Sequence, residues 1–552
     1  MHYIQPAPLW RESLLFVFII LITSVRAADV AKKKTFEREI PAANGATLII
    51  EENRGDLKIE GCDENKISVR AVLGVRNGNQ DMVGQYIEHS GLSLKKTADG
   101  ARIDFRTPDE IEEDSVIDDF INRLNHLMKT GKWHVSVLRR MTVSVPRKYN
   151  LQIHNKYGDV FIRNVDGQLR IENGSGEVHV KACSGYLNLK NSYATATVSD
   201  FEGSVKVKNS SGEVNLSDIQ GSADIENSYR DVLINQIAGD CVIQSSSAEI
   251  KGRNIGGNCR VRSSYRPIYI SDVKGDLDVN GSSAAVTALR VTGHTEIESS
   301  YRDIVAEDID KDLIIKGSSA SVTVSRIGGP VSIRSSYNPV KVKDVTGSLD
   351  VDGSSCSVEA ISVAGDVAIR ATYKEIKLDG IEGVVEVHGS SAPVTAANLM
   401  KSAVIHSSYK PIQVKDIEGD LEVDGSSCPV SVENIGGDLE ITNSYKYVIV
   451  KGSEGSIMVN SSSSPIEVTD VKHIPENGSI ELMTTYKPIT LTIPRGINGW
   501  LEAKTKYGEI AIDLPGSERV SSSKDWVRFS MGKGDIQILL KTDKDITVGE
   551  NE

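Results

Sequence analysis

The sequence predicts an all-β fold, a parallel β-solenoid with coils of eighteen residues, and two observations lead to it. Nine tyrosines, from Tyr157 to Tyr445, follow one another at equal intervals of thirty-six residues, and a serine lies midway in each interval. The period is therefore half that interval, and it runs through 18 units without an insertion. The second observation is that apolar residues recur in pairs within every unit. A unit this short cannot bury an apolar face alone, whereas stacked units bury a continuous core.

Each unit contains two predicted strands. With the Tyr or Ser counted as position zero, Val or Ile stands three residues later in 17 of 18 units, and the residue five later is apolar except at Gly252. A second apolar pair follows at positions twelve and fourteen, as in Leu349 and Val351. Residues i and i+2 of a strand point to the same side, so both pairs face inward. Val and Ile favour strands, and no helical apolar spacing persists, which excludes a helical repeat.

The spacing of these pairs favours a right-handed, flattened coil. The left-handed hexapeptide β-helix has coils of the same length, but its aliphatic residues recur every six, whereas the pairs here recur every nine. Gly stands at position ten in 15 of 18 units and, with steps such as Asp352-Gly353, marks the turns. At about 4.8 Å per coil, about 20 coils would form a rod roughly 95 Å long.

The two ends depart from the repeat, and we expect both to be caps. The segment 54–59 resembles 157–162, so a first coil is predicted to begin near residue 45. Residues Ser115–Lys129 place their apolar side chains on one helical face, which predicts a short amphipathic helix that covers an open sheet edge. A membrane-surface helix is the alternative, although basic residues are few. The predicted regions are an N-terminal β region with this insertion (28–150), the regular solenoid (151–472), and irregular C-terminal coils with a cap (473–552).

Residues 1–27 are typical of a signal peptide. Arg11 precedes the apolar run from Leu14 to Ile22, and Val25-Arg26-Ala27 follows it, so we expect cleavage after Ala27. A membrane span needs about 20 apolar residues, and this run is shorter. The predicted protein is exported, to the periplasm, the cell surface or the medium. It would contact a membrane only through an uncleaved leader, which is the alternative.

Composition narrows the classes of partner. Lys and Arg number 63 against 76 Asp and Glu, a net charge of −13, which argues against a nucleic-acid partner because such a partner needs a basic face. Six cysteines are too few for a disulfide scaffold, and no cofactor motif is found in the sequence. The oligomeric state is not predicted.

One segment carries a family resemblance. Residues Met141–Ile162 read MTVSVPRKYNLQIHNKYGDVFI, a strand that ends in Val-Pro, then polar and apolar alternation, then Gly-Asp-Val-x-Ile. Together with the coils that follow, this pattern resembles the putative-adhesin family of exported bacterial β-solenoids, from about Thr47 to Leu540. The resemblance implies surface or periplasmic binding, and it brings no catalytic residues.

Position zero supplies the candidate binding residues. Position nine is the matching place half a coil later, and it holds charged residues in several coils, such as Asp166, Lys274 and Glu418, so the tyrosines are expected to face water. They would form a row with a spacing of about 9.6 Å, every second coil. Aromatic rings beside cations can bind glycans or anionic polymers. The alternative is that each ring lies over the neighbouring serine and shields the turn. The predicted row consists of Tyr265, Tyr301, Tyr337, Tyr373 and Tyr409, with the basic residues Arg266, Arg302, Lys374 and Lys410.

Four other repeated features have structural interpretations. From Ser192 to Ser462 a hydroxyl residue precedes position zero, which predicts a ladder that satisfies turn amides. Asp recurs at position seven, where capping of a turn is expected rather than calcium binding. His388 and His406 share one position in adjacent coils and Asp424 follows; we expect a solvent-facing ladder and no metal. Cys241 and Cys259 also share a position, and their spacing permits a disulfide, although both are predicted to face inward, where Cys is often a small apolar residue.

The function predicted from these features is non-catalytic binding or adhesion, with a glycan or another cell-envelope polymer as partner. A structural rod or spacer of the envelope is the first alternative. A polysaccharide lyase or hydrolase is the second, but such enzymes need a cleft with convergent catalytic groups, and 18 coils without an insertion offer no loops to build one.

Overall fold

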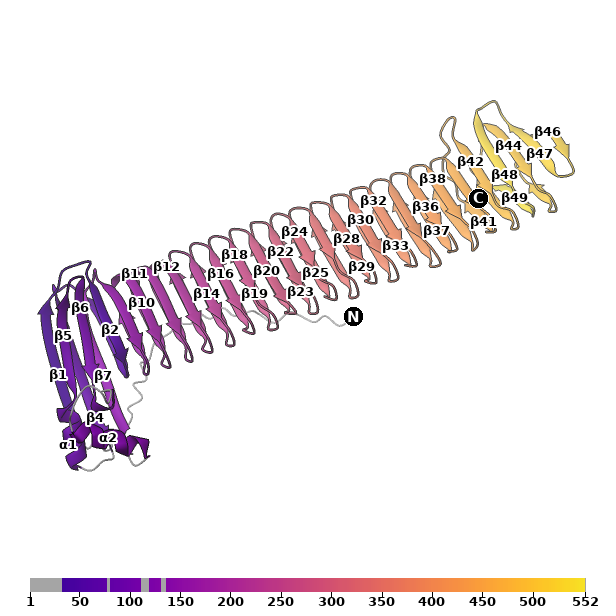
Figure 1. The fold of residues 1–552 in the computed structure, drawn as a ribbon. Coiled ribbons are helices and arrows are strands. Elements are labelled where there is room, and N and C mark those ends of the chain that lie inside the picture. The colour runs from indigo at the N-terminus through magenta and orange to yellow at the C-terminus, as the bar shows by residue number, and fades with distance from the viewer. Residues whose placement is uncertain (1–31, 77–79, 111–118, 131–135, 552) are drawn as a thin grey trace, which may run out of the picture.

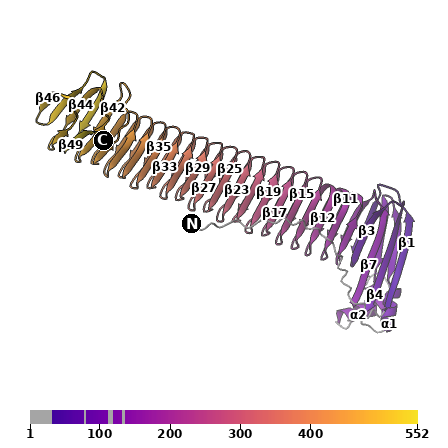
Figure 2. The same cartoon turned by 180° about the vertical axis from the view of Figure 1, so that it is seen from behind.

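A computed structural model describes residues 32–76, 80–110, 119–130 and 136–551. The predicted signal peptide and its cleavage site lie outside the described residues. The rod of stacked coils lies between two terminal regions, as both views show (Figure 1, Figure 2). Within the described ranges, no helix is long and apolar enough to cross a membrane.

The predicted β-solenoid is confirmed. Each coil contributes one strand to each of two parallel sheets, and each strand pairs with the corresponding strand of the next coil. We call the sheet that contains the first strand of each coil the front sheet and the other the back sheet. The front strands are β13 (Val214–Ile219), β15 (Val232–Ile237), β17 (Ile250–Ile255), β19 (Ile268–Val273), β21 (Val286–Val291), β23 (Ile304–Ile309), β25 (Val322–Ile327), β27 (Val340–Val345), β29 (Val358–Val363), β31 (Ile376–Ile381), β33 (Val394–Leu399), β35 (Ile412–Ile417), β37 (Val430–Ile435), β39 (Val448–Ser453), β41 (Ile466–Thr469) and β43 (Ile489–Ile493).

The back strands alternate with the front strands along the chain. They are β14 (Ala223–Asn227), β16 (Cys241–Ser245), β18 (Cys259–Arg262), β20 (Leu277–Ser282), β22 (Thr295–Ser299), β24 (Leu313–Lys316), β26 (Val331–Arg334), β28 (Leu349–Gly353), β30 (Val367–Ala371), β32 (Val385–Gly389), β34 (Ala403–Ser407), β36 (Leu421–Gly425), β38 (Leu439–Asn443), β40 (Ile457–Ser461) and β42 (Ser479–Met483). Both predicted apolar pairs point inward: Ile250 and Gly252 of β17, and Cys241 and Ile243 of β16, are buried. The core is therefore a continuous aliphatic layer between the two sheets. The handedness stays a prediction.

The first coils have the same arrangement with longer strands. Strands β8 (Asn150–Asn155) and β10 (Asp166–Asn173) belong to the back sheet, and β9 (Val160–Arg163) belongs to the front sheet. Strands β11 (Val178–Asn191) and β12 (Ala196–Asn209) continue around the edge and contribute to both sheets.

The aspartates at position seven have a conformational explanation. Asp200, Asp218, Asp272, Asp308, Asp344, Asp416 and Asp470 all have a φ between 53° and 59°. Asp and Asn tolerate this left-handed conformation better than most residues. The row therefore marks the place where each front strand bends at its end.

Buried asparagines form a ladder two residues before position zero, which was not predicted from the sequence. Nδ2 of Asn155 donates to Oδ1 of Asn173 at 2.9 Å, and Nδ2 of Asn173 donates to Oδ1 of Asn191 at 3.3 Å. The role predicted for the hydroxyl ladder is wrong, because turn amides are bound by backbone carbonyls: the amide of Ser247 donates to the carbonyl of Ser228 at 2.9 Å.

The predicted first coil is confirmed. Strands β2 (Thr47–Asn53) and β3 (Asp56–Cys62) stack in parallel on β8 and β9, with Leu57 opposite Val160 and Ile59 opposite Ile162. This pairing aligns the matching positions of the two similar segments, 54–59 and 157–162, as the sequence predicts. On the other side of this coil, β6 (Gly100–Arg106) pairs in parallel with β2 and β7 (Ser136–Pro146) pairs in parallel with β3, so both sheets continue into the N-terminal region.

The N-terminal cap consists of strands rather than of the predicted helix. Antiparallel strands β4 (Lys66–Arg76) and β1 (Lys32–Pro41) extend the sheet beyond β7 (Ser136–Pro146), and β5 (Gly91–Thr97) pairs antiparallel with β6 (Gly100–Arg106). Helix α2 (Asp119–Lys129) forms within the predicted segment, and its first predicted residues, 115–118, lie outside the described ones. Helix α1 (Gln80–Glu88) was not predicted, and the 3₁₀ turn η1 (Pro108–Glu110) precedes α2. Both helices lie beyond the ends of β4 and β7 (Figure 1), so neither covers the open edge of the sheet.

At the C-terminal end the strand order differs from the chain order. Strand β48 (Ile536–Lys541) lies between β42 and β44 (Gly499–Lys504), and β49 (Ile546–Glu550) lies between β43 and β45 (Ile510–Ile512). The last two strands of the chain thus lie inside the rod, and β44 and β45, which precede them in sequence, lie nearer its C-terminal end. Antiparallel strands β47 (Trp526–Met531) and β46 (Glu518–Ser523) then close the back sheet beyond β44.

Candidate binding surfaces

The tyrosines at position zero lie at the turn between a back strand and the next front strand. The five rings of the predicted row, Tyr265, Tyr301, Tyr337, Tyr373 and Tyr409, are between 63% and 70% exposed. Their predicted orientation toward water is therefore confirmed. We call these five residues the tyrosine edge.

The turns of the tyrosine edge differ from those of the intervening coils. In the intervening coils the residue after the serine is small and fully buried, as are Ala284, Ala320 and Cys356. After each tyrosine, the residue is instead polar and exposed, as are Arg302 and Asn338. The intervening serines are half-buried, but the rings beside them keep about two thirds of their surface in solvent. Contact with the turn therefore covers only a minor part of the surface of each ring.

The predicted basic neighbours are exposed, but their charge is partly balanced. Arg266, Arg302, Lys374 and Lys410 are all exposed. Arg266 lies 3.9 Å from a carboxylate oxygen of Glu249, and Asp303 and Glu375 directly follow Arg302 and Lys374. The tyrosine edge therefore offers aromatic faces with little net charge.

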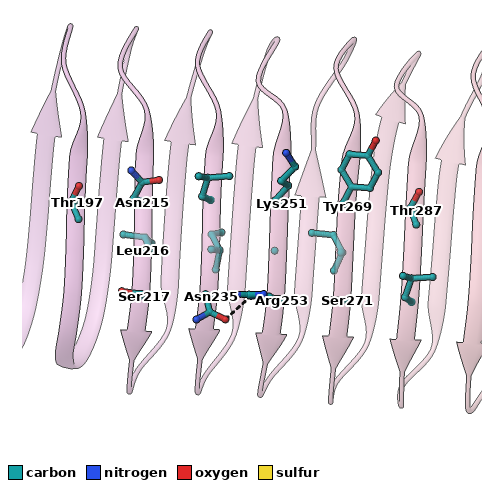
Figure 3. A pocket seen from close by; sticks show the side chains of 15 residues that line it. Thr197, Asn215, Leu216, Ser217, Asn235, Lys251, Arg253, Tyr269, Ser271 and Thr287 are labelled. Carbon is teal, nitrogen blue, oxygen red and sulfur yellow. Dashed lines mark hydrogen bonds between the residues drawn. The ribbon is translucent and has the colours of Figure 1, made fainter. Parts of the chain in front are cut away.

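A second surface, which was not predicted from the sequence, is a groove on the outside of the front sheet. It has a volume of about 510 Å³ and extends across six coils, from Thr197 to Thr287 (Figure 3). Its floor is the backbone at Leu216, Ile234 and Gly252, whose own positions are buried. We call this hollow the front groove.

Side chains at positions four and six form the walls of the front groove. Leu233 and Tyr269 at position four are 37% and 43% exposed, and the amides of Asn215 and Asn235 and the cations of Lys251 and Arg253 line the same hollow. Arg253 Nε donates to Asn235 Oδ1 at 2.9 Å, the dashed line in Figure 3. Lys251 lies 2.7 Å from Glu249, and this hydrogen bond raises the pKa of the Lys251 ammonium.

The front groove continues toward the N-terminal end. A neighbouring hollow of about 660 Å³ is lined by Phe161, His179 and Lys181, among others. The rings of Phe161 and His179 stack with centroids 4.9 Å apart and planes 1° apart. Lys181 lies 3.5 Å from Asp200 at the rim.

The sulfhydryl pair is in register but unbonded. Cys241 of β16 is directly opposite Cys259 of β18, both are buried, and both are free thiols. The contact with Cys241 and the burial raise the pKa of Cys259, and a raised pKa lowers the thiolate fraction that disulfide formation needs. The structure therefore does not contain the candidate disulfide, which stays a prediction for an oxidising compartment.

The histidine pair forms the expected exposed ladder. The rings of His388 and His406 stack with centroids 4.9 Å apart, and His388 Nε2 lies 2.6 Å from an oxygen of Glu386. His406 Nδ1 is 3.6 Å from Asp424. Across the described ranges, no group of three or more His, Cys, Asp or Glu side chains is placed to hold a metal ion.

Comparisons with known proteins identify no family. No protein-family model matches the chain, and no curated protein matches it. Among solved structures, the chain is similar to one from Clostridium sporogenes described as a "putative cell adhesion protein", with 12% identity and a TM-score of 0.22. That match covers 36% of this chain and 100% of the other. So low a score carries no argument about function, and the adhesin resemblance stays a prediction.

Proposed function

We propose that this chain is a non-catalytic, exported binding solenoid whose tyrosine edge holds an extended glycan or another cell-envelope polymer. The observation that carries the proposal is the exposure of the five rings, each between 63% and 70%, at one position of every second coil. An exposed ring on a regular scaffold supplies a large apolar face at little conformational cost, and a sugar ring can pack against it.

The regular spacing supports a polymer rather than a small ligand. Each ring is about 9.6 Å from the next, since two coils separate them. A single ring binds weakly, but a polymer that meets several rings gains affinity through effective concentration. The mixed charges around the rings, such as Arg302 beside Asp303, favour an uncharged polymer at this edge.

The coils also support a non-enzymatic role. From Tyr157 to Tyr445, a range that the structure describes in full, no coil carries an insertion that could form the walls of a catalytic cleft beside the tyrosine edge. Glycan cleavage needs two carboxyl groups on opposite sides of the bond, or an equivalent set of catalytic groups. We therefore place polymer retention, rather than turnover, at this surface.

The test is a binding screen with matched variants. The exported chain is incubated with insoluble polysaccharides and isolated cell-wall fractions, and the retained fraction is measured. The variant Tyr301→Ser, Tyr337→Ser, Tyr373→Ser removes three adjacent rings, and serine already occupies this position in the intervening coils. If each ring contributes about 0.5–1.5 kcal/mol, the loss is roughly 10- to 1000-fold in affinity.

Two controls make the result specific. Replacing the same three tyrosines with Phe keeps the rings, so binding should survive if stacking is the cause. The thermal unfolding of all variants should match that of the unmodified chain, because these side chains are exposed. Equal binding by the serine variant would remove the tyrosine edge from the site, and retention of no polymer by the unmodified chain would favour a structural rod.

A further inference from the structure

The front groove differs in charge from the rest of the molecule. Over the eight coils from Phe161 to Leu289, the outward positions of the front sheet hold four basic residues and no acidic one, although the whole chain has a net charge of −13. The four are Arg163, Lys181, Lys251 and Arg253.

The outward positions of the back sheet in the same coils provide a comparison of charge. These positions hold six basic and six acidic residues. They pair across neighbouring coils, as in Lys208 with Glu226 at 2.7 Å and Arg260 with Asp278 at 3.2 Å.

The cations of the front sheet have no acidic partner at its outward positions, but Lys251 and Lys181 reach carboxylates at the strand ends, Glu249 at 2.7 Å and Asp200 at 3.5 Å. Of the two cations that line the front groove, Arg253 is therefore the one without such a partner in the part of the chain that the structure describes.

Arg253 is the cation best placed to receive a ligand. It is exposed beside the groove floor at Gly252, and its Nε is oriented by Asn235. Among the described residues, no carboxylate lies within ion-pair distance, 4.0 Å, of its guanidinium. A guanidinium held in this way can donate two parallel hydrogen bonds to a carboxylate.

Tyr269 supplies an apolar face on the next strand, directly opposite Lys251 and diagonal to Arg253. Its ring lies on the neighbouring front strand β19 and is 43% exposed in the wall of the groove, as Figure 3 shows. The amides of Asn215 and Asn235 add donors and acceptors suited to hydroxyl groups. An aromatic face, an exposed guanidinium and several amides within one hollow are the groups that an acidic sugar requires.

We infer that the front groove binds an anionic oligosaccharide, with the carboxylate of a uronic-acid unit on Arg253 and a sugar ring against Tyr269. This site goes beyond the proposed function, because it lies on another surface and takes a charged ligand. A nucleic acid fits less well, since its phosphates need a row of cations and the groove offers Lys251 and Arg253 alone among the residues that line it.

The test measures binding of oligogalacturonate to the whole exported chain by titration calorimetry, with a neutral oligosaccharide of equal length as the comparison. The variant Arg253→Ser, Tyr269→Thr places at each position the residue that the next coil has there, Ser271 and Thr287, so the coil is expected to fold. We expect binding about tenfold weaker or worse, because both the charge-assisted contact and the ring are lost. The affinity of the unmodified chain should also fall as salt is added.

Two control variants show whether the loss of binding is specific to the front groove. Arg334→Ser removes the same charge from an exposed position of the back sheet and should leave oligogalacturonate binding unchanged. The tyrosine-edge variant should likewise keep it, which makes failure of one proposal distinguishable from failure of the other. Equal loss with Arg334→Ser, equal binding of the neutral oligosaccharide, tighter binding of single-stranded DNA, or no binding at all would overturn the inference.

Discussion

Replacing Ile243 with Asp tests the inward orientation on which the whole fold depends. Ile243 lies in β16 with Ile225 and Val261 directly opposite on the neighbouring strands, and all three are fully buried. Loss of a buried aliphatic side chain of this size costs about 2–5 kcal/mol. An unpaired carboxyl group in the same place adds a further penalty of several kcal/mol, or is protonated instead. We therefore expect a total cost of at least about 4 kcal/mol.

The assay must resolve single coils, since a solenoid unfolds through neighbour-to-neighbour contacts. Hydrogen exchange followed by mass spectrometry should show lost protection in β14, β16 and β18, and urea unfolding should shift to lower concentration. The matched control is Val242→Asp, one residue earlier on the solvent side, where Asp224 and Arg260 lie opposite. Its expected effect is within about 0.5 kcal/mol. If both variants unfold like the unmodified chain, the inward assignment is wrong.

Two further predictions concern a turn and the N-terminal cap. Gly353→Ala should destabilise the fold by about 1–3 kcal/mol, because the new Cβ would overlap Cys356 Sγ and lie 2.5 Å from the carbonyl oxygen of Ser335. The control is Gly281→Ala, where the nearest atom to the new Cβ is 3.2 Å away. Thermal unfolding of the two variants checks this prediction, and equal melting temperatures would contradict it. Burial alone would raise the pKa of Asp109, yet hydrogen bonds from Thr107 and Tyr86 and the charge of Arg139 lower it overall. A carboxyl group whose pKa is lower in the folded state stabilises the fold less as the pH falls below its unfolded pKa, about 4. The N-terminal cap should therefore lose protection against hydrogen exchange below about pH 4. Asp109→Asn should remove this pH dependence of the protection.

The repeat was predictable because it is local and identical in every coil. The alternation of Val340 and Val342 specifies a strand with one buried face, and only stacking of many such strands can bury that face. The exposure of Tyr301 followed from the same register, since a turn residue between two inward pairs has no core to enter. The first coil at β2 and β3 was recoverable because its sequence repeats that of residues 157–162.

Where the register breaks, only the tertiary structure decides which strands meet. The insertion of β48 between β42 and β44 joins segments that are distant in the chain, and no local pattern distinguishes this order from a simple succession. The buried ladder of Asn155 and Asn173 was missed because an isolated asparagine next to a turn is usually exposed. The front groove depends on side chains from six coils, whose outward positions vary freely in sequence because the core does not constrain them. Its hollow exists only once stacking brings the strand of Tyr269 next to the strand of Lys251 and Arg253, with Tyr269 opposite Lys251 and diagonal to Arg253.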